Sequence, residues 1–269
     1  MSSGSNDVYI AQISDLHVML PGRRAFDVID TAAHLSRCVK HILGLRPRPA
    51  AVIVSGDLVD EGSEAEYRRL RELLVPLDSP PGTPVYLMPG NHDRRAALRV
   101  VFADHRYFDS PAGTLNHALN IGALRVLALD TVVENEPHGA LDDAQIAWLD
   151  AALRTAPDQP ALLFMHHPPV ASGMALMDRI ALEPQSARKL EAVVRAHRQV
   201  LHIGCGHVHR PIRTTWAGTA VSICPSTAFQ SALAFAGGEW SPAMDEPPGY
   251  QLYHWNGGQL AAHTIAVQS

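Results

Sequence analysis

The chain has 269 residues, of which 46% are hydrophobic and 18% charged, and its formal net charge is −5. This composition predicts a folded domain with a sizeable core and excludes an intrinsically disordered chain. The charges form no long run of one sign, which argues against a surface that coats a nucleic-acid polymer.

The sequence predicts a cytoplasmic protein. Its three cysteines are too few and too scattered for a disulfide framework, which fits a reducing compartment. The first residues hold no basic region followed by an apolar stretch, so we expect no signal peptide. Since no apolar run approaches the roughly 20 residues that cross a bilayer, we expect a soluble protein without a membrane partner.

Short apolar runs alternate with helical patterns through the first part of the chain. Strands are expected at 8–14, 51–55 and 85–88. The second of them is hydrophobic throughout, which is typical of a strand buried on both faces. Apolar residues at helical spacing predict one helix from Val28 to Ile42 and another from Tyr67 to Leu77.

The second part of the chain combines hairpins with two more helices. Asp142 is a predicted N-cap for a helix that continues through Leu153. The remaining expected elements are a hairpin at 115–120 and 124–130, strands at 162–165, 200–204, 219–223 and 251–255, and a helix at 186–197. This order predicts an α/β fold in which two mixed β-sheets pack face to face with helices outside.

We expect residues 1–269 to form a single domain. Its C-terminal segment, 225–269, is expected to contribute to a pocket or to an interface between copies of the chain. The apolar stretch 228–236 is a candidate for such a homo-oligomer interface, because an apolar loop needs a covering surface, but internal packing would also cover it.

Several predicted strands end directly in residues of the kinds that bind metals. The carboxyl ends of strands in an α/β fold meet at one edge of the sheet, where such folds place their sites. On strand-like backbone, residues two apart point the same way, so each Asp-x-His or His-x-His pair can face one cavity. The fragments, in chain order, are Asp15-Leu16-His17, Gly56-Asp57-Leu58-Val59-Asp60, Gly90-Asn91-His92-Asp93, His166-His167-Pro168-Pro169 and Gly206-His207-Val208-His209.

Glycine precedes Asp57, Asn91 and His207 in three of these fragments. We interpret these glycines as tight turns in which the backbone bends sharply. Each fragment alone is a weak signal, whereas five of them in this order, each after an apolar strand, indicate a metal centre.

The five fragments resemble the signature of the calcineurin-like metallophosphoesterase family. That signature reads D-x-H, G-D-x-x-D, G-N-H-D/E, a later His and G-H-x-H, and every block is present here without a substitution. The resemblance implies a four-layer αββα sandwich and a metal-dependent phosphoric diester hydrolase. Residues 166–169, 206–211 and 247–250 look most like those of bacterial cyclic-nucleotide and glycerophosphodiester phosphodiesterases.

The resemblance implies two metal ions held by seven residues. Oxygen and imidazole ligands without thiolate suit Mn, Fe, Zn or Co. Two such ions about 3.5–4 Å apart can activate a bridging hydroxide for attack on phosphorus, so no protein nucleophile is needed. The implied sets are Asp15, His17 and His209 for one ion, Asn91, His166 and His207 for the other, and Asp57 as the bridge.

The resemblance also implies a catalytic role for His92. This side chain would stabilise the phosphoryl transition state or protonate the leaving oxygen. Asp60 would be its partner and fix its orientation, with Asp93 as a second candidate. A helix or turn cap is the alternative role for Asp60.

The roles of several neighbouring residues stay open at this point. His167 follows a predicted ligand on a strand and should point away from it, so we interpret it as a supporting residue. Arg94, Arg95 and Arg210 flank the fragments and could meet phosphate or face solvent. The sequence does not decide whether His117 approaches the site.

The expected substrate is a small phosphodiester, a cyclic nucleotide or a glycerophosphodiester. A diester carries one negative charge and a monoester close to two, and positive charge near the fragments is sparse. The alternatives are an enzyme for phosphomonoesters, nucleotide pyrophosphates or phosphoproteins, and a non-catalytic binding module, although no ligand residue is missing. The pocket wall would separate the enzyme classes, and we expect it from residues 18–26, 170–182 and 229–249.

Overall fold

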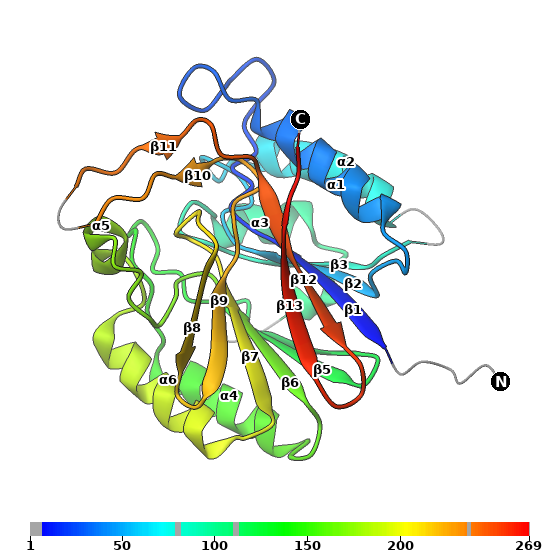
Figure 1. The fold of residues 1–269 in the computed structure, drawn as a ribbon, viewed down its shortest axis with the longest axis vertical. Coiled ribbons are helices and arrows are strands. Elements are labelled where there is room, and N and C mark those ends of the chain that lie inside the picture. The colour runs from blue at the N-terminus through cyan, green and yellow to red at the C-terminus, as the bar shows by residue number, and fades with distance from the viewer. Residues whose placement is uncertain (1–6, 79–81, 110–112, 236–237, 269) are drawn as a thin grey trace.

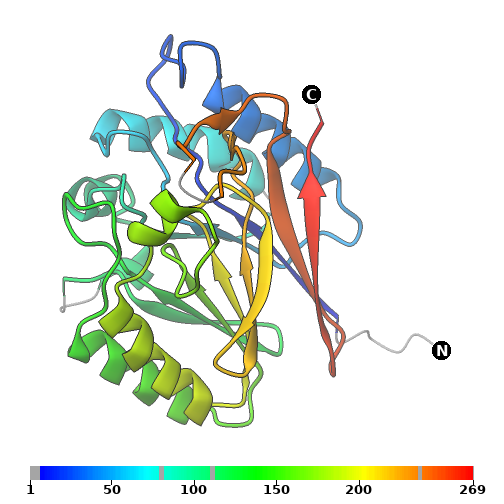
Figure 2. The ribbon, with the colours of Figure 1, turned by 60° about the vertical axis from the view of Figure 1, so that its left-hand side comes forward.

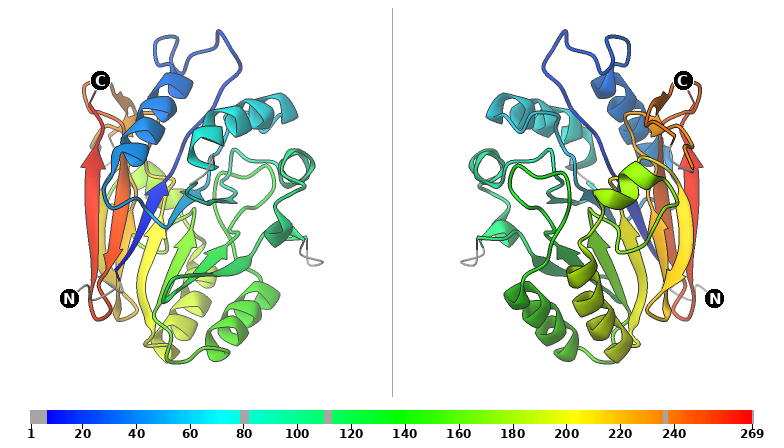
Figure 3. Two further views of the ribbon diagram at one scale, coloured as in Figure 1. Left: turned by 90° about the vertical axis from the view of Figure 1, so that its right-hand side faces the viewer. Right: turned by 90° about the vertical axis from the view of Figure 1, so that its left-hand side faces the viewer.

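The computed structural model describes residues 7–78, 82–109, 113–235 and 238–268 (Figure 1). Two mixed β-sheets pack against each other in the middle of the molecule, and helices cover their outer faces (Figure 3). The predicted fold class is therefore confirmed.

The first sheet has five strands in the order β13-β12-β1-β2-β3. Its parallel part comes from the start of the chain and contains β1 (Val8–Ile13), β2 (Ala51–Ser55) and β3 (Val85–Met88). The hairpin of β12 (Gly249–Trp255) and β13 (Leu260–Ala266) joins this part antiparallel to β1. The last strands of the chain thus complete the sheet that the first strand begins.

The second sheet has six strands in the order β4-β5-β6-β7-β9-β8. Its four central strands are parallel, and the two edge strands are antiparallel to their neighbours. In chain order the strands are β4 (His117–Ile121), β5 (Leu124–Leu129), β6 (Ala161–Met165), β7 (Val200–Cys205), β8 (Ile212–Trp216) and β9 (Thr219–Ile223).

Helices α1 (Thr31–Gly44), α2 (Glu64–Asp78) and α3 (Arg95–Val101) share one hydrophobic cluster with the outward-facing residues of the first sheet. Helices α4 (Asp143–Arg154) and α6 (Pro184–Ala196) cover the second sheet in the same way. The Asp142 side chain accepts from the Gln145 amide at 2.7 Å, so the predicted N-cap of α4 is confirmed.

Several short elements were not predicted, because helical segments of three to seven residues and strands of two residues are too brief to show a periodic pattern. The 3-10 turn Arg106–Phe108 and α3 follow β3, whereas α5 (Ala175–Arg179) follows β6. β10 (Gln230–Ser231) and β11 (Pro242–Ala243) form a two-stranded ribbon that lies at the same end of the molecule as α5 (Figures 1 and 2).

Among the residues that the structure describes, every helix is too short or too polar to cross a membrane.

Candidate metal centre

The parallel strands bring all seven predicted metal ligands to one end of the two sheets. Asp15 and His17 follow β1, and Asp57 and Asn91 follow β2 and β3 of the same sheet. The second sheet supplies the three remaining histidines, after β6 and β7. The first ligand group is Asp15, His17 and His209, whose ligand atoms lie within 4.8 Å of one another and of a carboxylate oxygen of Asp57.

The backbone that presents these ligands is not strand-like. Asp15, His17, Asp57, His207 and His209 have φ values of 53°, 42°, 48°, 72° and 52°, all in the left-handed region. The prediction that paired ligands face one cavity through strand alternation was therefore wrong in its geometry. Left-handed non-glycine residues cost about 1–3 kcal/mol each and concentrate at functional sites. The surrounding hydrogen bonds must hold them in place.

Backbone hydrogen bonds join the loop after β1 to the loop after β2. The amide of Asp15 donates to the carbonyl of Gly56 at 3.0 Å. The amides of Leu16 and His17 both donate to the carbonyl of Asp57, at 2.8 and 3.0 Å. These three bonds fix the ligands of one loop relative to the ligand of the other.

Only one of the three glycines serves the sharp turn that we predicted. Gly56 has φ +96°, which suits glycine. Gly90 and Gly206 have no such φ, and their role is close approach. A Cβ on Gly90 would collide with the backbone nitrogen of Asp57, and a Cβ on Gly206 would collide with the Ser14 hydroxyl.

The first ligand group contains a contact that calls for a cation. His17 Nδ1 lies 3.3 Å from Asp60 Oδ1, and His209 Nδ1 lies 3.0 Å from the Phe229 carbonyl. Since both partners only accept, each Nδ1 carries the proton in the neutral ring. The unprotonated Nε2 atoms of His17 and His209 then face each other at 3.0 Å. Asp15 Oδ1 lies 3.4 Å from His209 Nε2. Lone pairs so placed repel unless positive charge lies between them.

The second ligand group, which consists of Asn91, His166 and His207, also brings ligand atoms close together. Asn91 Oδ1 lies 2.9 Å from His207 Nδ1 and 3.2 Å from His166 Nε2. His166 Nδ1 approaches the Ser55 carbonyl at 2.8 Å, so the neutral ring keeps its proton on Nδ1 and directs Nε2 at oxygen acceptors, which favour a proton or a metal ion there. A cation would satisfy both atoms at once.

Asp57 lies between the two groups. Its Oδ2 is 3.3 Å from His166 Nε2 and 3.6 Å from His17 Nε2, while its Oδ1 accepts from the His92 amide at 2.9 Å. Burial opposes ionisation, yet the imidazoles of His166, His92 and His17 hold the pKa of Asp57 well below its usual range. Its carboxylate is therefore charged and adjoins both groups.

The electrostatics of the centre favour positive charge. Burial lowers the pKa of His166, but the Asp57 and Asp15 carboxylates raise it to about 9. Burial raises the pKa of Asp15 to about 6, and its Oδ2 finds no hydrogen-bond partner among the described residues. A buried site that stabilises a proton on His166 and leaves Asp15 Oδ2 without a hydrogen bond would also accommodate a metal ion.

His92 lines the cavity above the first ligand group, with its side chain 40% exposed. Its ring meets that of His17 edge to face at 4.6 Å. His92 Nδ1 bonds to the Asp60 backbone carbonyl at 2.8 Å, whereas the Asp60 carboxylate is 4.0 Å away and lies closer to His17. The contact expected between Asp60 and His92 is thus made by the backbone of Asp60.

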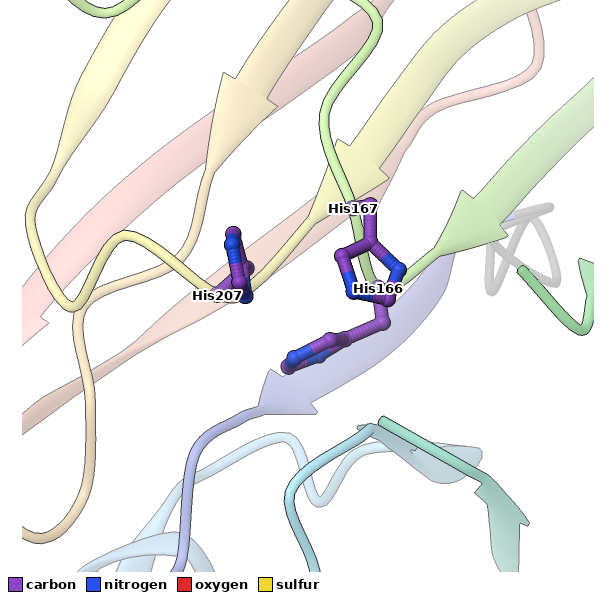
Figure 4. Close-up of side chains that lie close together, drawn as sticks. All are labelled: His166, His167 and His207. Carbon is purple, nitrogen blue, oxygen red and sulfur yellow. The ribbon is translucent and has the colours of Figure 1, made fainter. Parts of the chain in front are cut away.

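His167 packs against the second ligand group, as Figure 4 shows. Its ring centroid is 4.6 Å from that of His207. However, its Nδ1 bonds to the Thr131 hydroxyl at 2.8 Å and its Nε2 to the Pro137 carbonyl at 3.2 Å. Both ring nitrogens are engaged, which agrees with a supporting role rather than a metal-binding one.

The three flanking arginines bind protein groups. Arg95 forms a bidentate pair with Asp130 at 2.6 and 2.7 Å. Arg94 approaches two carbonyls of its own loop, and Arg210 bonds to Glu246 at 3.0 Å. None of the three lines the cavity over the ligands.

A group of hydrogen bonds around Asp93 and Tyr67, which we call the Asp93 clamp, was not predicted. The buried Asp93 carboxylate accepts from the amides of Leu58 and Gly90, at 3.1 and 2.8 Å, and from the Tyr67 hydroxyl at 2.9 Å. The Tyr67 hydroxyl also accepts from the Arg94 amide at 2.9 Å. The only available signal was a tyrosine on the apolar face of α2, whose hydroxyl needs a partner when buried.

A cavity of about 370 Å³ opens above the ligands. Residues from all three segments that were expected to build the wall line this cavity. Among the described residues, Arg24 is the only arginine or lysine that lines it. His117 is buried elsewhere, against Tyr107. The wall residues from the three segments are Met19, Arg24, Ala25, Phe26, Leu176, Met177, Ile180, Phe229, Ser231 and Trp240.

Comparisons with known proteins agree with this geometry. The chain is 34% identical over 251 residues to a glycerophosphodiester phosphodiesterase of Enterobacter lignolyticus, covering 93% of this chain and 87% of that protein. It is 32% identical to a cAMP/cGMP dual specificity phosphodiesterase of Mycobacterium tuberculosis, covering 92% and 76%. A dimetal phosphatase from Danio rerio has the same fold, with a TM-score of 0.67, 17% identity and coverage of 97% and 99%.

The family model for calcineurin-like phosphoesterases matches residues 8–211, which include all five fragments that were predicted to bind metal. The match covers most of the chain, and the resemblance found in the sequence is confirmed. The chain belongs to the calcineurin-like phosphoesterase family.

Proposed function

We propose that this protein is a binuclear metal-dependent phosphodiesterase that acts on small phosphodiesters. The observation that carries the proposal is the pair of ligand groups that adjoin Asp57 at the floor of a cavity whose wall holds one arginine. The names of the two bacterial relatives, which act on glycerophosphodiesters and cyclic nucleotides, support the same class of substrate.

The ligand sets fit two ions chosen from Mn, Fe, Zn and Co, because they offer carboxylate, amide and imidazole atoms and no thiolate. Asp57 would be shared between the sets. When bound, such ions supply a hydroxide for in-line attack on phosphorus and offset charge on the phosphoryl oxygens. Ser55 and Phe229 keep the imidazole tautomers correct by accepting from His166 and His209.

His92 is the proposed acid or transition-state donor. Its Nδ1 is held by the Asp60 carbonyl, and its Nε2 makes no hydrogen bond within the described part of the chain. This bond orients the ring and leaves Nε2 available to a leaving oxygen. The Asp60 carboxylate would not contact the substrate but would orient the predicted ligand His17 by accepting from its Nδ1.

The wall favours diesters over monoesters. A monoester brings close to two negative charges, and an enzyme that prefers it gains from several arginines or lysines. Here the candidate arginines Arg94, Arg95 and Arg210 are bound to protein groups, which leaves Arg24 at the cavity. We also propose that 225–269 belongs to the same catalytic unit, since it supplies Phe229 and Trp240 to the wall.

The test compares bis-p-nitrophenyl phosphate with p-nitrophenyl phosphate, which share one leaving group. The protein is loaded in turn with each metal, and kcat/KM is measured for both esters. Asp57→Ala, in which the shared ligand is lost, shows how much turnover comes from this centre. We expect the diester to be preferred, and a tenfold preference for the monoester in every activating metal would contradict the proposal.

A further inference from the structure

One wall of the cavity is aromatic. The rings of Phe26 and Phe229 meet edge to face with centroids 5.0 Å apart. Trp240 lies 5.8 Å from Phe26 and 6.4 Å from Phe229. All three line the cavity above the metal ligands, so a bound substrate would meet this wall.

The wall begins at the metal centre itself. Phe229 packs on His209 at 4.7 Å and on His17 at 5.5 Å, measured between ring centroids. From there the aromatic surface extends to Phe26, which is 45% exposed at the mouth. A phosphodiester whose phosphorus lies at the metal ligands would therefore place an ester substituent along these rings.

The backbone holds Phe26 in this position at a cost. Phe26 has φ +52° and Asp27 has φ +62°, and the left-handed region is unusual for a bulky residue. A nearly half-exposed phenyl ring contributes little to the core, so burial does not explain the conformation. Strained residues of this kind cluster at ligand-binding positions.

The indole of Trp240 is also fixed in orientation. Its Nε1 donates to the Ser231 hydroxyl at 2.8 Å, and Ser231 is fully buried. This hydrogen bond already uses the only N–H donor of the indole ring. What Trp240 offers the cavity is mainly its apolar ring.

We propose that Phe26, Phe229 and Trp240 form a subsite for an uncharged planar ring carried on an ester group of the substrate. This inference rests on the proposed phosphodiesterase function and adds that Phe26 and Trp240 set a preference for ring-bearing diesters over glycerol diesters. Aromatic side chains stack on any planar π-system. A quaternary ammonium group also suits aromatic rings, but Arg24 lines the same cavity and would repel it.

The first test measures kcat/KM of the wild type, Phe26→Ala and Trp240→Ala on cyclic AMP and on glycerophosphoglycerol. The loss caused by each variant is taken separately for each substrate, so that differences in leaving group cancel. Loss of one stacking ring costs about fivefold or more, and we expect this loss for cyclic AMP to exceed that for glycerophosphoglycerol by at least that factor. Trp240→Phe keeps a ring and should restore much of the preference.

Phe235→Ala is the matched control. Phe235 is 56% exposed and lies in the segment between β10 and β11, as Trp240 does, but it does not line the cavity. Its replacement should leave kcat/KM for both substrates unchanged. If Phe235→Ala reproduced the selective loss, a general loosening of the ribbon would explain it, and the subsite would be refuted.

The second test reads binding without turnover. Zinc-loaded protein is titrated with adenosine 5′-monophosphate and, as a ring-free counterpart, glycerol 3-phosphate, while tryptophan fluorescence is recorded. We expect the nucleotide to change the signal in the wild type and not in Trp240→Phe.

The outcomes separate this inference from the function on which it rests. No turnover of any diester would refute the proposed function. Diester turnover with equal losses on both substrates would refute the aromatic subsite alone. The same variants are also assayed on glycerophosphocholine, and a loss confined to this substrate would refute the subsite too, because the rings would then hold a cation.

Discussion

The role of the Asp93 clamp can be tested by removing a single oxygen atom, the hydroxyl of Tyr67. Tyr67→Phe removes the hydroxyl that donates to Asp93 and accepts from the Arg94 amide, each at 2.9 Å. Tyr67 is fully buried, so phenylalanine keeps the packing. The clamp joins the loop of Asp57 to the loop of Asn91, and we expect both the stability of the fold and the metal affinity to fall.

The magnitude follows from the two lost bonds. A hydrogen bond to a charged group contributes about 1.5–3 kcal/mol, and a buried amide left without a partner costs about 1–3 kcal/mol. Partial relaxation of the loop would reduce the sum, so we expect the free energy of unfolding to drop by about 2–4 kcal/mol. For a chain of this size that corresponds to a fall in Tm of roughly 4–7 °C.

Chemical denaturation of the metal-free protein measures the stability, and calorimetric titration with zinc measures the affinity. Tyr86→Phe is the matched control, because the Tyr86 ring packs on Tyr107 and its hydroxyl bonds to none of the described residues. The control should unfold like the wild type. Tyr67→Phe with unchanged stability and zinc affinity would refute the clamp.

Three further predictions concern the metal centre and its surroundings. His92→Ala should keep its metal content and lose about 10²–10⁴-fold in rate on esters with poor leaving groups, because it removes a donor and no ligand; metal loss in elemental analysis would contradict this role. Asp57→Ala should lower the occupancy of both metal positions, whereas Asn91→Ala should mainly weaken one, and equal metal contents of the two variants would contradict a shared carboxylate. Burial lowers the pKa of His117 to about 4, from an ordinary value near 6.5. The unfolded state therefore binds its proton first, and stability that is complete above about pH 6.5 is lost towards pH 4, by up to about 1.4 kcal/mol per pH unit. Denaturation at pH 7.5 and pH 5 should show a smaller drop for His117→Asn than for the wild type, and an equal drop would rule this contribution out.

The sequence predicted several strands well because their apolar pattern is strong. β2, β3 and β9 have the predicted limits, and β2 and β3 are apolar runs bounded by polar or turn residues. β8 and β13 escaped prediction because they carry exposed residues at several positions, so burial imposes little pattern on their sequences.

The sequence predicted that the candidate ligands would lie together, but it did not predict their geometry. Ligand types at strand ends were enough to assemble Asp15, Asp57 and His166, because parallel strands end at one edge. Left-handed backbone at aspartate and histidine leaves no mark in the sequence, and neither does the distance between two bare imidazole nitrogens. The aromatic wall was also out of reach, because Phe26 and Trp240 are about two hundred residues apart and meet only in the folded chain.

The centre takes ligands from both sheets, so it depends on how the sheets are placed relative to each other. Apolar contacts between the sheets are non-directional and would tolerate sliding. Gln12 on β1 supplies direction: its amide nitrogen donates to Ser55 Oγ at 2.7 Å and to the Cys205 carbonyl of the second sheet at 3.1 Å, and its oxygen accepts from Tyr253 at 2.6 Å. A buried polar group whose partners are all present specifies one arrangement, because any shift would leave it unpaired. Ser55 in turn accepts from His166 through its carbonyl. The register of the two sheets and the position of His166, a predicted metal ligand, therefore depend on one chain of hydrogen bonds.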